Sequence, residues 1–314
     1  FNYLDNIGNK NNKVSSFLTI QEGCDKFCSF CVVPYTRGPE YSRPFNKIIS
    51  EAESLIKNGS KEIILLGQNV NAYSFKDKIK EYRISDLINK LDSYDALKRI
   101  RYTTSHPRDF TKDLIQAHKD CEKLMPLIHL PVQSGSNKIL ENMNRKHTIE
   151  EYLEIIKKLK KVRINIELSS DFIIGYPGET QYDFEQTIKL MKEVKFISSY
   201  SFIYSARPGT PAFNLKKVDQ NLAKERLIIF QNISKKIKSE YRERFLKKIV
   251  PVLFENKTKD KNKYFGRDEH FNSVIVESNE NLTGKIKNIQ ITKLNQNTLF
   301  GKISSKLMQK DFAA

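Results

Sequence analysis

EGCDKFCSFCVVPYTRG, residues 22–38, packs three of the chain's four cysteines close together, at Cys24, Cys28 and Cys31. Three thiols are one too many for a single disulfide and one too few for a closed tetrahedral zinc site. The stretch follows a predicted strand and reaches Pro34 soon after the last cysteine, so a loop is favoured over a helix. The sequence therefore predicts a loop that offers three sulfur donors.

Three thiolates on one loop suit a [4Fe–4S] cluster in which the protein caps three irons and leaves the fourth open. Zinc is an alternative, although a structural zinc ion needs a fourth ligand that this stretch lacks. A loop without any metal is the third alternative. We interpret Cys121, in a predicted helix-to-strand connection, as a small buried apolar residue. Clustered cysteines without a disulfide framework indicate a reducing compartment, and we expect the cytoplasm.

Short apolar runs alternate with amphipathic runs along the first two thirds of the chain. The predicted strands are Phe17–Gln21, Glu62–Leu66, Arg99–Thr103, Pro126–Leu130, Asn165–Ile174 and Ser198–Tyr204. The predicted helices between them are Phe45–Asn58, Ser85–Leu91, Thr111–Lys119, Thr148–Lys160 and Thr180–Val194. Six strand–helix repeats predict a parallel sheet that closes part-way, a partial (β/α)6 barrel of the TIM type.

Polar and glycine-rich motifs follow each predicted strand. After the cysteine stretch come GQNVN (67–71), TTSHP (103–107), PVQSGS (131–136), GYPGET (175–180) and SARPGTP (205–211). In barrels of this kind the carboxyl ends of the strands carry the chemistry. We therefore expect these motifs to gather around the cysteines.

A long helix is predicted at 219–247, and we place its apolar stripe at Ile229, Ile233, Ile237, Tyr241 and Phe245. The sequence pattern changes after this helix. Short β-rich runs punctuated by glycine then predict a five-stranded antiparallel barrel of the OB type. The expected division is 1–13 as a linker, 14–244 as the core domain with its long helix, and 245–308 as the small barrel.

The charge balance favours a polyanionic partner. The chain has 54 Lys and Arg against 37 Asp and Glu, a net charge of +17. Residues 245–306 are basic and carry Tyr264, Phe265, Phe271 and Phe300. Lysines beside stackable rings are typical of barrels that bind single-stranded nucleic acid, although a general lysine bias would give the same composition. No apolar run approaches the roughly 18 residues that a membrane-spanning helix needs, so no membrane contact is expected.

The Cys-x3-Cys-x2-Cys loop resembles that of the radical S-adenosylmethionine (SAM) superfamily. The resemblance implies that SAM binds the open iron through its amino and carboxylate groups and that one electron from the cluster breaks its sulfonium bond. Further motifs, spread in order along nearly the whole chain, resemble one family within this superfamily. They are Val33-Pro34, Arg37-Gly38, Ser42-Arg43, LLGQNVNAY (65–73), TTSHP, HLPVQSGS (129–136), SSDFIIGYPGET (169–180) and YSFIYSARPGTPA (200–212).

These motifs resemble the methylthiotransferases, in particular those that add a methylthio group to C2 of isopentenyladenosine at position 37, beside the tRNA anticodon. Branches that act on threonylcarbamoyladenosine or on a ribosomal-protein aspartate are alternatives. So is a non-catalytic RNA-binding protein stapled by zinc. The small barrel resembles the TRAM domain, an RNA-binding module.

The resemblance implies site residues. Cys24, Cys28 and Cys31 would ligate the cluster. The residues that it suggests for SAM binding are Gln68, Asn69, Gln133, Ser134, Gly135, Asp171, Gly175 and Arg207. Plain turn, cap and packing roles compete for several of them. Arg37 and Arg43 are further candidates for anion contacts, and His106 and His129 are more plausible as structural side chains than as proton carriers. Hydrogen abstraction by a radical needs no protein base, so no catalytic side chain is assigned.

The resemblance also implies partners: the tRNA anticodon loop and a flavodoxin or ferredoxin as electron donor. Nothing in the sequence indicates an oligomer, so we expect a monomer. Members of the family begin with another domain, whose three cysteines hold a second cluster that supplies sulfur. Residues 1–314 contain no second cysteine triplet. We therefore expect this chain to hold one cluster and to cleave SAM, but not to insert sulfur unaided.

Overall fold

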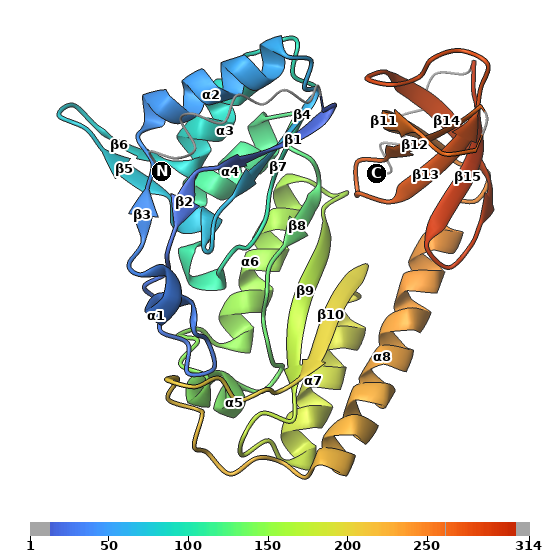
Figure 1. The fold of residues 1–314 in the computed structure, drawn as a ribbon. Coiled ribbons are helices and arrows are strands. Elements are labelled where there is room, and N and C mark those ends of the chain that lie inside the picture. The colour runs from blue at the N-terminus through green and yellow to red at the C-terminus, as the bar shows by residue number, and fades with distance from the viewer. Residues whose placement is uncertain (1–12, 261, 306–314) are drawn as a thin grey trace.

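The fold was analysed in a computed structural model, which describes residues 13–260 and 262–305 (Figure 1). The predicted linker, residues 1–13, lies almost entirely outside the described residues, as do the last three residues of the predicted small barrel. The described chain forms a large α/β unit and a small all-β barrel joined by one long helix.

Six parallel strands form the inner wall of the large unit, and all six were predicted. They are β1 (Ser15–Thr19), β4 (Glu62–Leu66), β7 (Arg99–Tyr102), β8 (Leu127–His129), β9 (Glu167–Ile174) and β10 (Ser198–Ile203). They pair in two groups of three, β1-β4-β7 and β8-β9-β10, in chain order. A single bridge, Ile100 to Leu124, joins the groups. The predicted partial barrel is confirmed, with its weakest lateral pairing between β7 and β8.

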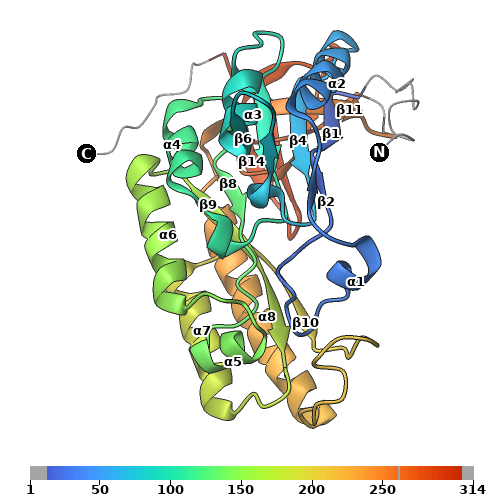
Figure 2. The same ribbon diagram turned by 90° about the vertical axis from the view of Figure 1, so that its left-hand side faces the viewer.

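Helices cover the outer face of this wall (Figure 2). They are α2 (Phe45–Lys57), α3 (Ile84–Asp92), α4 (Lys112–Asp120), α6 (Ile149–Val162), α7 (Gln181–Val194) and α8 (Gln220–Glu243). The side chains of Leu18, Ile63 and Ile128 are fully buried between strands and helices. Capping boxes begin α6, at Thr148 and Glu151, and α7, at Thr180 and Asp183, which fixes where these helices start.

Several short elements were not predicted. The hairpin of β5 (Ser74–Lys76) and β6 (Glu81–Arg83) projects from the barrel, and α5 (Asn137–Asn142) lies in the loop after β8. The cysteine stretch contains α1 (Val33–Arg37) and is bounded by β2 (Gln21–Glu22) and β3 (Tyr41–Ser42). These elements have too few residues to show a periodic apolar pattern, which explains why the sequence did not reveal them.

The small barrel is closed, with strand order β11-β12-β13-β15-β14. Its strands are β11 (Ile249–Lys257), β12 (Lys263–Arg267), β13 (Ser273–Glu277), β14 (Ile286–Leu294) and β15 (Thr298–Ile303). Five strands were predicted, but the purely antiparallel pairing was wrong, because β13 and β15 are parallel. An odd number of strands in a closed barrel makes at least one parallel pair unavoidable.

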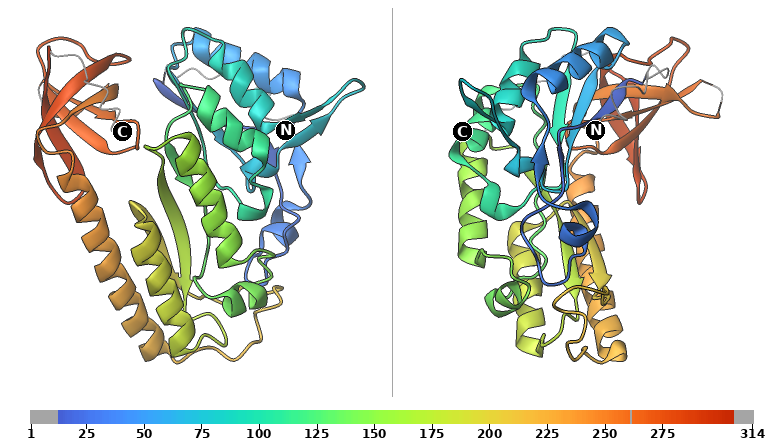
Figure 3. Two further views of the ribbon diagram at one scale, coloured as in Figure 1. Left: turned by 180° about the vertical axis from the view of Figure 1, so that it is seen from behind. Right: turned by 60° about the vertical axis from the view of Figure 1, so that its left-hand side comes forward.

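Helix α8 runs from the far end of the large unit to the small barrel (Figure 3). The predicted helix was correct, and so was most of its buried stripe, since Ile233 packs against the core and Ile237 and Tyr241 are buried; only Ile229 was misplaced. Phe230 is fully buried, whereas Ile229 is 48 % exposed; Ile237 and Tyr241 complete the buried face. The helix also ends at Glu243, so Phe245 lies beyond it and packs against the core of the small barrel.

Two arginines of β7 hold the small barrel against the amino-terminal end of the parallel strands. Arg99 donates to the carbonyl oxygens of Pro251, Arg267 and Asp268, and Arg101 donates to those of Asp268 and Glu269. The cysteine loop follows the carboxyl end of β1, so it lies at the opposite end of the strands (Figure 1).

Two of the aromatic residues predicted to stack nucleic-acid bases are used inside the fold. Two guanidinium groups lie over the Phe271 ring: that of Arg101 is 4.8 Å from the ring centroid, and that of Arg267 is 4.0 Å from it. Tyr264 is only 6 % exposed and belongs to the barrel core. Phe265 and Phe300 remain partly exposed. Phe271 therefore belongs to the contact with the core domain rather than to a free RNA-binding face.

Candidate metal centre in the cysteine loop

Pairing of β2 with β3 closes the base of the cysteine loop, with Gln21 opposite Ser42 and Glu22 opposite Tyr41. Inside this base the backbone of Cys24 donates to Gly38, 3.2 Å away. Gly23 has φ +73°. A Cβ built on it would lie 1.9 Å from the Pro39 carbonyl oxygen, so only glycine fits this position. The loop is thus a preformed structure with a tight neck.

The three thiols lie within electrostatic range of one another in the loop. Cys28 and Cys31 both contribute to raising the pKa of Cys24, to about 11, although the main cause is burial of that thiol. Burial also raises the pKa of Cys31. Burial disfavours thiolates unless a positive group compensates them, which iron would do on binding. Across the described parts of the chain, no three His, Cys, Asp or Glu side chains converge tightly enough for a single metal ion.

Several buried polar atoms in the segments after β4 and β7 and before α6 have no hydrogen-bond partner within residues 13–260 and 262–305. Among the described residues, the buried atoms without a hydrogen-bond partner include Asn69 Oδ1, Ser105 Oγ, His106 Nε2, Arg145 Nε and His147 Nε2. Buried polar groups ordinarily find partners. Three sulfur donors on a preformed loop together with these orphaned atoms fit a [4Fe–4S] cluster with a polar ligand on its open iron.

Gln68 and Gln21 fix the neck of the loop. Gln68 Oε1 accepts from the backbone N–H of Gly23 at 2.7 Å, and Gln21 Nε2 donates to the Gly23 carbonyl, also at 2.7 Å. Gln21 Oε1 in turn accepts from the backbone N–H of Asn69 at 3.0 Å. Gln68, predicted to contact SAM, thus uses its carbonyl oxygen to hold the cysteine loop in place.

A polar cluster ties the loop to the segment after β7. Lys26 pairs with Asp109 at 2.9 Å, and Asn69 Nδ2 donates to Asp109 at 2.7 Å and to Glu40 at 3.1 Å. Asn69 is 2 % exposed, and both protons of its amide nitrogen are engaged in this cluster. Lys26, Glu40 and Asp109 were not predicted, because isolated charges in loops carry no pattern.

The opposite side of the loop rests on the segment after α5. The backbone N–H of Ser29 donates to the Met143 carbonyl at 2.9 Å, and Asn144 Nδ2 donates to the Phe27 carbonyl at 2.8 Å. The backbone N–H of Ala212 donates to the Ser29 carbonyl at 2.9 Å, which brings the SARPGTP motif against the cysteines. The expected gathering is therefore observed directly for 67–71, whereas the segments after β7 and β10 reach the loop through Asp109 and Ala212, just beyond their motifs.

Arg145 touches a cysteine directly and was missed in the sequence. Its Nη1 lies 3.6 Å from Cys28 Sγ, and its Nη2 donates to the Pro131 carbonyl. The available signal was the basic run Arg145-Lys146 just ahead of the α6 capping box, in a segment that belongs to neither a strand nor a helix.

The QSG segment after β8 is held mainly by structural contacts. Gln133 has φ +77°, and its backbone N–H donates to Asp171. The backbone N–H of Gly135 donates to Thr187 Oγ1 at 2.9 Å, and Ser134 Oγ lies 3.4 Å from the same hydroxyl. Ser134 and Gly135 pack against α7, and this packing explains their presence without any contact to SAM.

The remaining residues predicted to contact SAM are Asp171, Gly175 and Arg207. Asp171 lies on β9 beside His129, with 3.4 Å between Asp171 Oδ2 and His129 Nε2, and its side chain is 32 % exposed. Gly175 has φ +70°, and a Cβ there would meet Ala223 of α8 at 2.8 Å, so its role is close packing. Arg207 is exposed.

The other predicted basic and cysteine residues have simple placements. Arg43 is buried, with its guanidinium pairing with Glu51 at 2.7 Å and donating to the Thr19 carbonyl, so it is structural. Arg37 is exposed at the end of α1. Cys121 is 3 % exposed, which confirms the interpretation of a buried residue. His106 accepts from the backbone of Arg108 through Nδ1.

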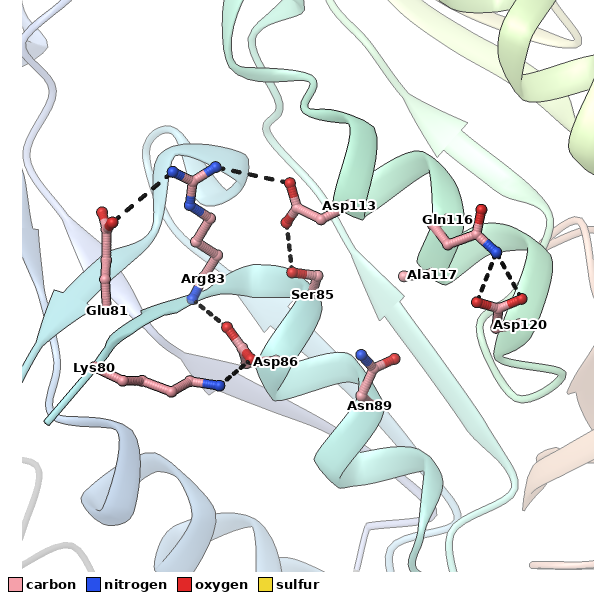
Figure 4. A pocket seen from close by; sticks show the side chains of 10 residues that line it. All are labelled: Lys80, Glu81, Arg83, Ser85, Asp86, Asn89, Asp113, Gln116, Ala117 and Asp120. Carbon is pink, nitrogen blue, oxygen red and sulfur yellow. Dashed lines mark hydrogen bonds and ion pairs between the residues drawn. The ribbon is translucent and has the colours of Figure 1, made fainter.

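A surface pocket of about 460 Å³ lies elsewhere, between α3 and α4 (Figure 4). Its polar side chains are paired with each other: Ser85 with Asp113, Lys80 with Asp86, and Gln116 with Asp120. None of the predicted site residues lines it. The pocket is an outer-surface hollow, and the cysteine loop remains the candidate site. No helix in the described ranges is long and apolar enough to cross a bilayer.

Comparison with known proteins agrees with this geometry. Residues 18–191 match the family model of the radical SAM superfamily, and residues 243–304 match that of the TRAM domain. Similar solved structures include the radical SAM methyltransferase TsrM from Kitasatospora setae, with a TM-score of 0.53, 16 % identity and coverage of 64 % of this chain and 38 % of that one. Another is the Escherichia coli radical SAM enzyme coproporphyrinogen III oxidase, with a TM-score of 0.52, 13 % identity and coverage of 95 % and 74 %.

The fold and the three-cysteine loop thus define a radical SAM protein with a TRAM domain. Among curated proteins, the tRNA-2-methylthio-N6-dimethylallyladenosine synthase of Pelagibacter ubique is 61 % identical over 315 residues, covering 99 % of this chain and 70 % of that protein. Its counterpart from the Wolbachia of Culex pipiens is 52 % identical, covering 91 % of this chain and 66 % of that protein. The chain belongs to this family of methylthiotransferases.

Proposed function

We propose that this chain is the radical SAM and RNA-binding part of a tRNA methylthiotransferase that modifies C2 of N6-isopentenyladenosine beside the anticodon. The observation that carries the proposal is the loop of Cys24, Cys28 and Cys31. It occurs in a chain whose curated relatives are named for this activity. The curated relatives are longer than this chain, so the activity of the whole protein is part of the proposal.

Cys24, Cys28 and Cys31 would hold a [4Fe–4S] cluster, with SAM on its fourth iron. When bound, this pair supplies a radical able to act on the adenine C2 position, which is unreactive in polar chemistry. The protein's own part is to hold the three thiols at the end of the strands through Gln68, Gln21 and the Lys26–Asp109 pair. Cys28 is buried, and Cys24 and Cys31 are partly buried.

The small barrel would bind the tRNA. Its partly exposed Phe265 and Phe300 and the lysines of residues 245–306 support this, since basic groups bind phosphates and rings stack on bases. The target adenine would have to leave its stack to reach the strand ends. A flavodoxin or ferredoxin would supply the electron, and the cytoplasm would be the place of action.

Sulfur insertion would need a second source of sulfur. The chain has four cysteines, and three of them would ligate the first cluster. Cys121 is buried between α3 and α4, with its thiol donating to Asn89 Oδ1, so it cannot replace three ligands. We propose that residues outside this sequence hold the sulfur-donating cluster.

The test is anaerobic reconstitution of the chain with iron and sulfide, followed by SAM and dithionite. We expect about four irons per chain and formation of 5′-deoxyadenosine, both lost in Cys28→Ala. Cys121→Ala is the matched control and should keep both. A chain that binds zinc but no iron would overturn the proposal and favour the RNA-binding alternative.

The branch of the family is tested separately by binding. An anticodon stem–loop carrying isopentenyladenosine should bind more tightly than one carrying threonylcarbamoyladenosine at the same salt concentration. Equal or reversed affinities would contradict the assigned substrate while leaving the cluster chemistry intact.

A further inference from the structure

Arg145 is a buried guanidinium that lies next to a predicted cluster ligand and has no carboxylate partner in the part of the chain that the structure describes. The residue is 5 % exposed. Its Nη1 lies 3.6 Å from Cys28 Sγ, its Nη2 donates to the Pro131 carbonyl, and its Nε is unpartnered among the described residues. A buried positive charge without an anion is costly, so this position favours a negative group nearby.

Three other basic side chains near the loop, Lys26, His106 and His147, add no unpaired positive charge to that of Arg145. Lys26 is neutralised by Asp109 at 2.9 Å. The rings of His106 and His147 lie edge to face, with centroids 5.7 Å apart. Burial lowers the pKa of His147 to about 4 and puts that of His106 far below its usual range, and the Arg145 charge adds to both effects. At neutral pH both rings are therefore uncharged.

The Arg145 side chain is fixed beside Cys28. The guanidinium is held in place because its backbone N–H donates to the Leu140 carbonyl at 2.9 Å and its side chain to Pro131. A fixed charge in a buried site interacts more strongly than one in water.

We propose that Arg145 is a positioning residue that raises the reduction potential of the cluster held by Cys24, Cys28 and Cys31. The proposal rests on the proposed function, which supplies the cluster. Reduction adds one electron, so the reduced cluster carries one more negative charge. A guanidinium beside a ligand sulfur stabilises that state, and hydrogen bonds to the sulfurs and net charge set such potentials. The effect is to make the electron easier to deliver before SAM is cleaved.

The experiment is potentiometry of the reconstituted full chain, followed by electron paramagnetic resonance of the reduced cluster, without SAM. Arg145→Gln removes the charge, and Arg145→Lys keeps it. Arg163→Gln is the matched control, because Arg163 is also a partly buried guanidinium that donates to a backbone carbonyl, that of Leu124. It follows the other end of α6, roughly 20 Å from the start of the helix at 1.5 Å per residue.

We expect Arg145→Gln to make reduction at least tenfold less favourable, about 59 mV for one electron. Arg145→Lys should stay within threefold of the parent chain, and Arg163→Gln should match it. The proposal is overturned if Arg145→Gln shifts the potential no more than Arg163→Gln. If Arg145→Gln retains no iron, Arg145→Lys decides, because a tenfold shift with the charge retained would also overturn it. A parent chain without iron would instead refute the proposed function.

Discussion

Gln68 and Gly23 are 45 positions apart in the sequence and are joined by a 2.7 Å hydrogen bond, from the Gly23 backbone N–H to Gln68 Oε1. The bond links the motif after β4 to the neck of the cysteine loop. It explains why a long polar side chain is placed at the end of a strand, and it assigns Gln68 a structural task whether or not SAM is present.

Gln68→Ala should therefore loosen the loop even in the cluster-free chain. The Gly23 donor would lose its partner, which costs about 1–3 kcal/mol for a buried group. We expect a lower melting temperature, faster hydrogen exchange in residues 22–31 and slower iron uptake. Gln116→Ala, which removes an exposed glutamine paired with Asp120, should change none of these. Normal exchange and iron uptake in Gln68→Ala would contradict this role.

Gly135→Ala should destabilise the fold without any ligand. A Cβ at this position would lie 2.5 Å from the Gln186 carbonyl oxygen and 2.5 Å from Thr187 Cα, and backbone cannot move as a side chain can. Overpacking of this kind typically costs about 1–3 kcal/mol. Urea unfolding of the cluster-free chain measures it.

Gly178→Ala is the comparison for that variant, because its Cβ would have room and only its φ of +83° would be strained. We expect it to cost less than Gly135→Ala. If Gly135→Ala is as stable as the parent chain and only SAM binding falls, the residue is a ligand contact and the packing explanation is wrong.

Arg99→Met should loosen the attachment of the small barrel to the large unit, although Arg101 keeps its own bonds to the barrel. The Arg99 guanidinium donates to three backbone carbonyls of residues 251, 267 and 268, and each unpaired buried carbonyl costs about 1–3 kcal/mol. Hydrogen exchange in residues 267–271 should accelerate, and the melting transition should broaden or split. Lys98→Met, at the exposed neighbouring position, is the control. Unchanged exchange in Arg99→Met would show that other contacts hold the barrel.

His118 should make stability depend on pH below neutrality. It is 1 % exposed, its Nε2 lies 2.6 Å from the Tyr102 hydroxyl, and burial lowers its pKa from 6.5 to about 3. The unfolded chain therefore binds this proton between pH 6.5 and pH 3 while the folded chain does not, so stability falls as the pH falls. At about 1.4 kcal/mol per pH unit, some 2 kcal/mol would be lost between pH 7 and pH 5.

The contribution of His118 is isolated by two variants. His118→Gln keeps a polar partner for Tyr102 but cannot titrate, so the difference in unfolding free energy between pH 7 and pH 5 should shrink by about that amount. Tyr102→Phe removes the bond but leaves the histidine, so it should lower stability at both pH values and keep the difference. An unchanged difference in His118→Gln would refute the assignment.

Most of the architecture could be read from periodicity. The six strands and the helices that cover them repeat apolar residues over enough positions for the pattern to be seen, and the capping residues Thr148 and Thr180 marked two helix starts. In the α8 stripe only Ile229 was misplaced, because the adjacent apolar residues Ile229 and Phe230 both fit a helical spacing and only packing selects one.

Only part of the candidate site could be predicted from the sequence. The cysteines were found because their spacing is itself a pattern. The roles of Gln68, Asn69 and Gly135 were not, since their partners at Gly23, Asp109 and Thr187 are distant in the sequence and only the fold brings them together. Arg145 was missed for the same reason: its partner Cys28 lies 117 positions away.

Placing the cysteine loop and the small barrel at opposite ends of the same six strands sets a minimum span for any RNA that engages both. Helix α8, with 24 residues at 1.5 Å each, already measures about 36 Å from the far end of the core to the barrel. A trinucleotide bearing the target base could occupy one end only. If RNA is recognised at both ends, the protein would select RNA by length and shape and would prefer a folded stem together with its loop.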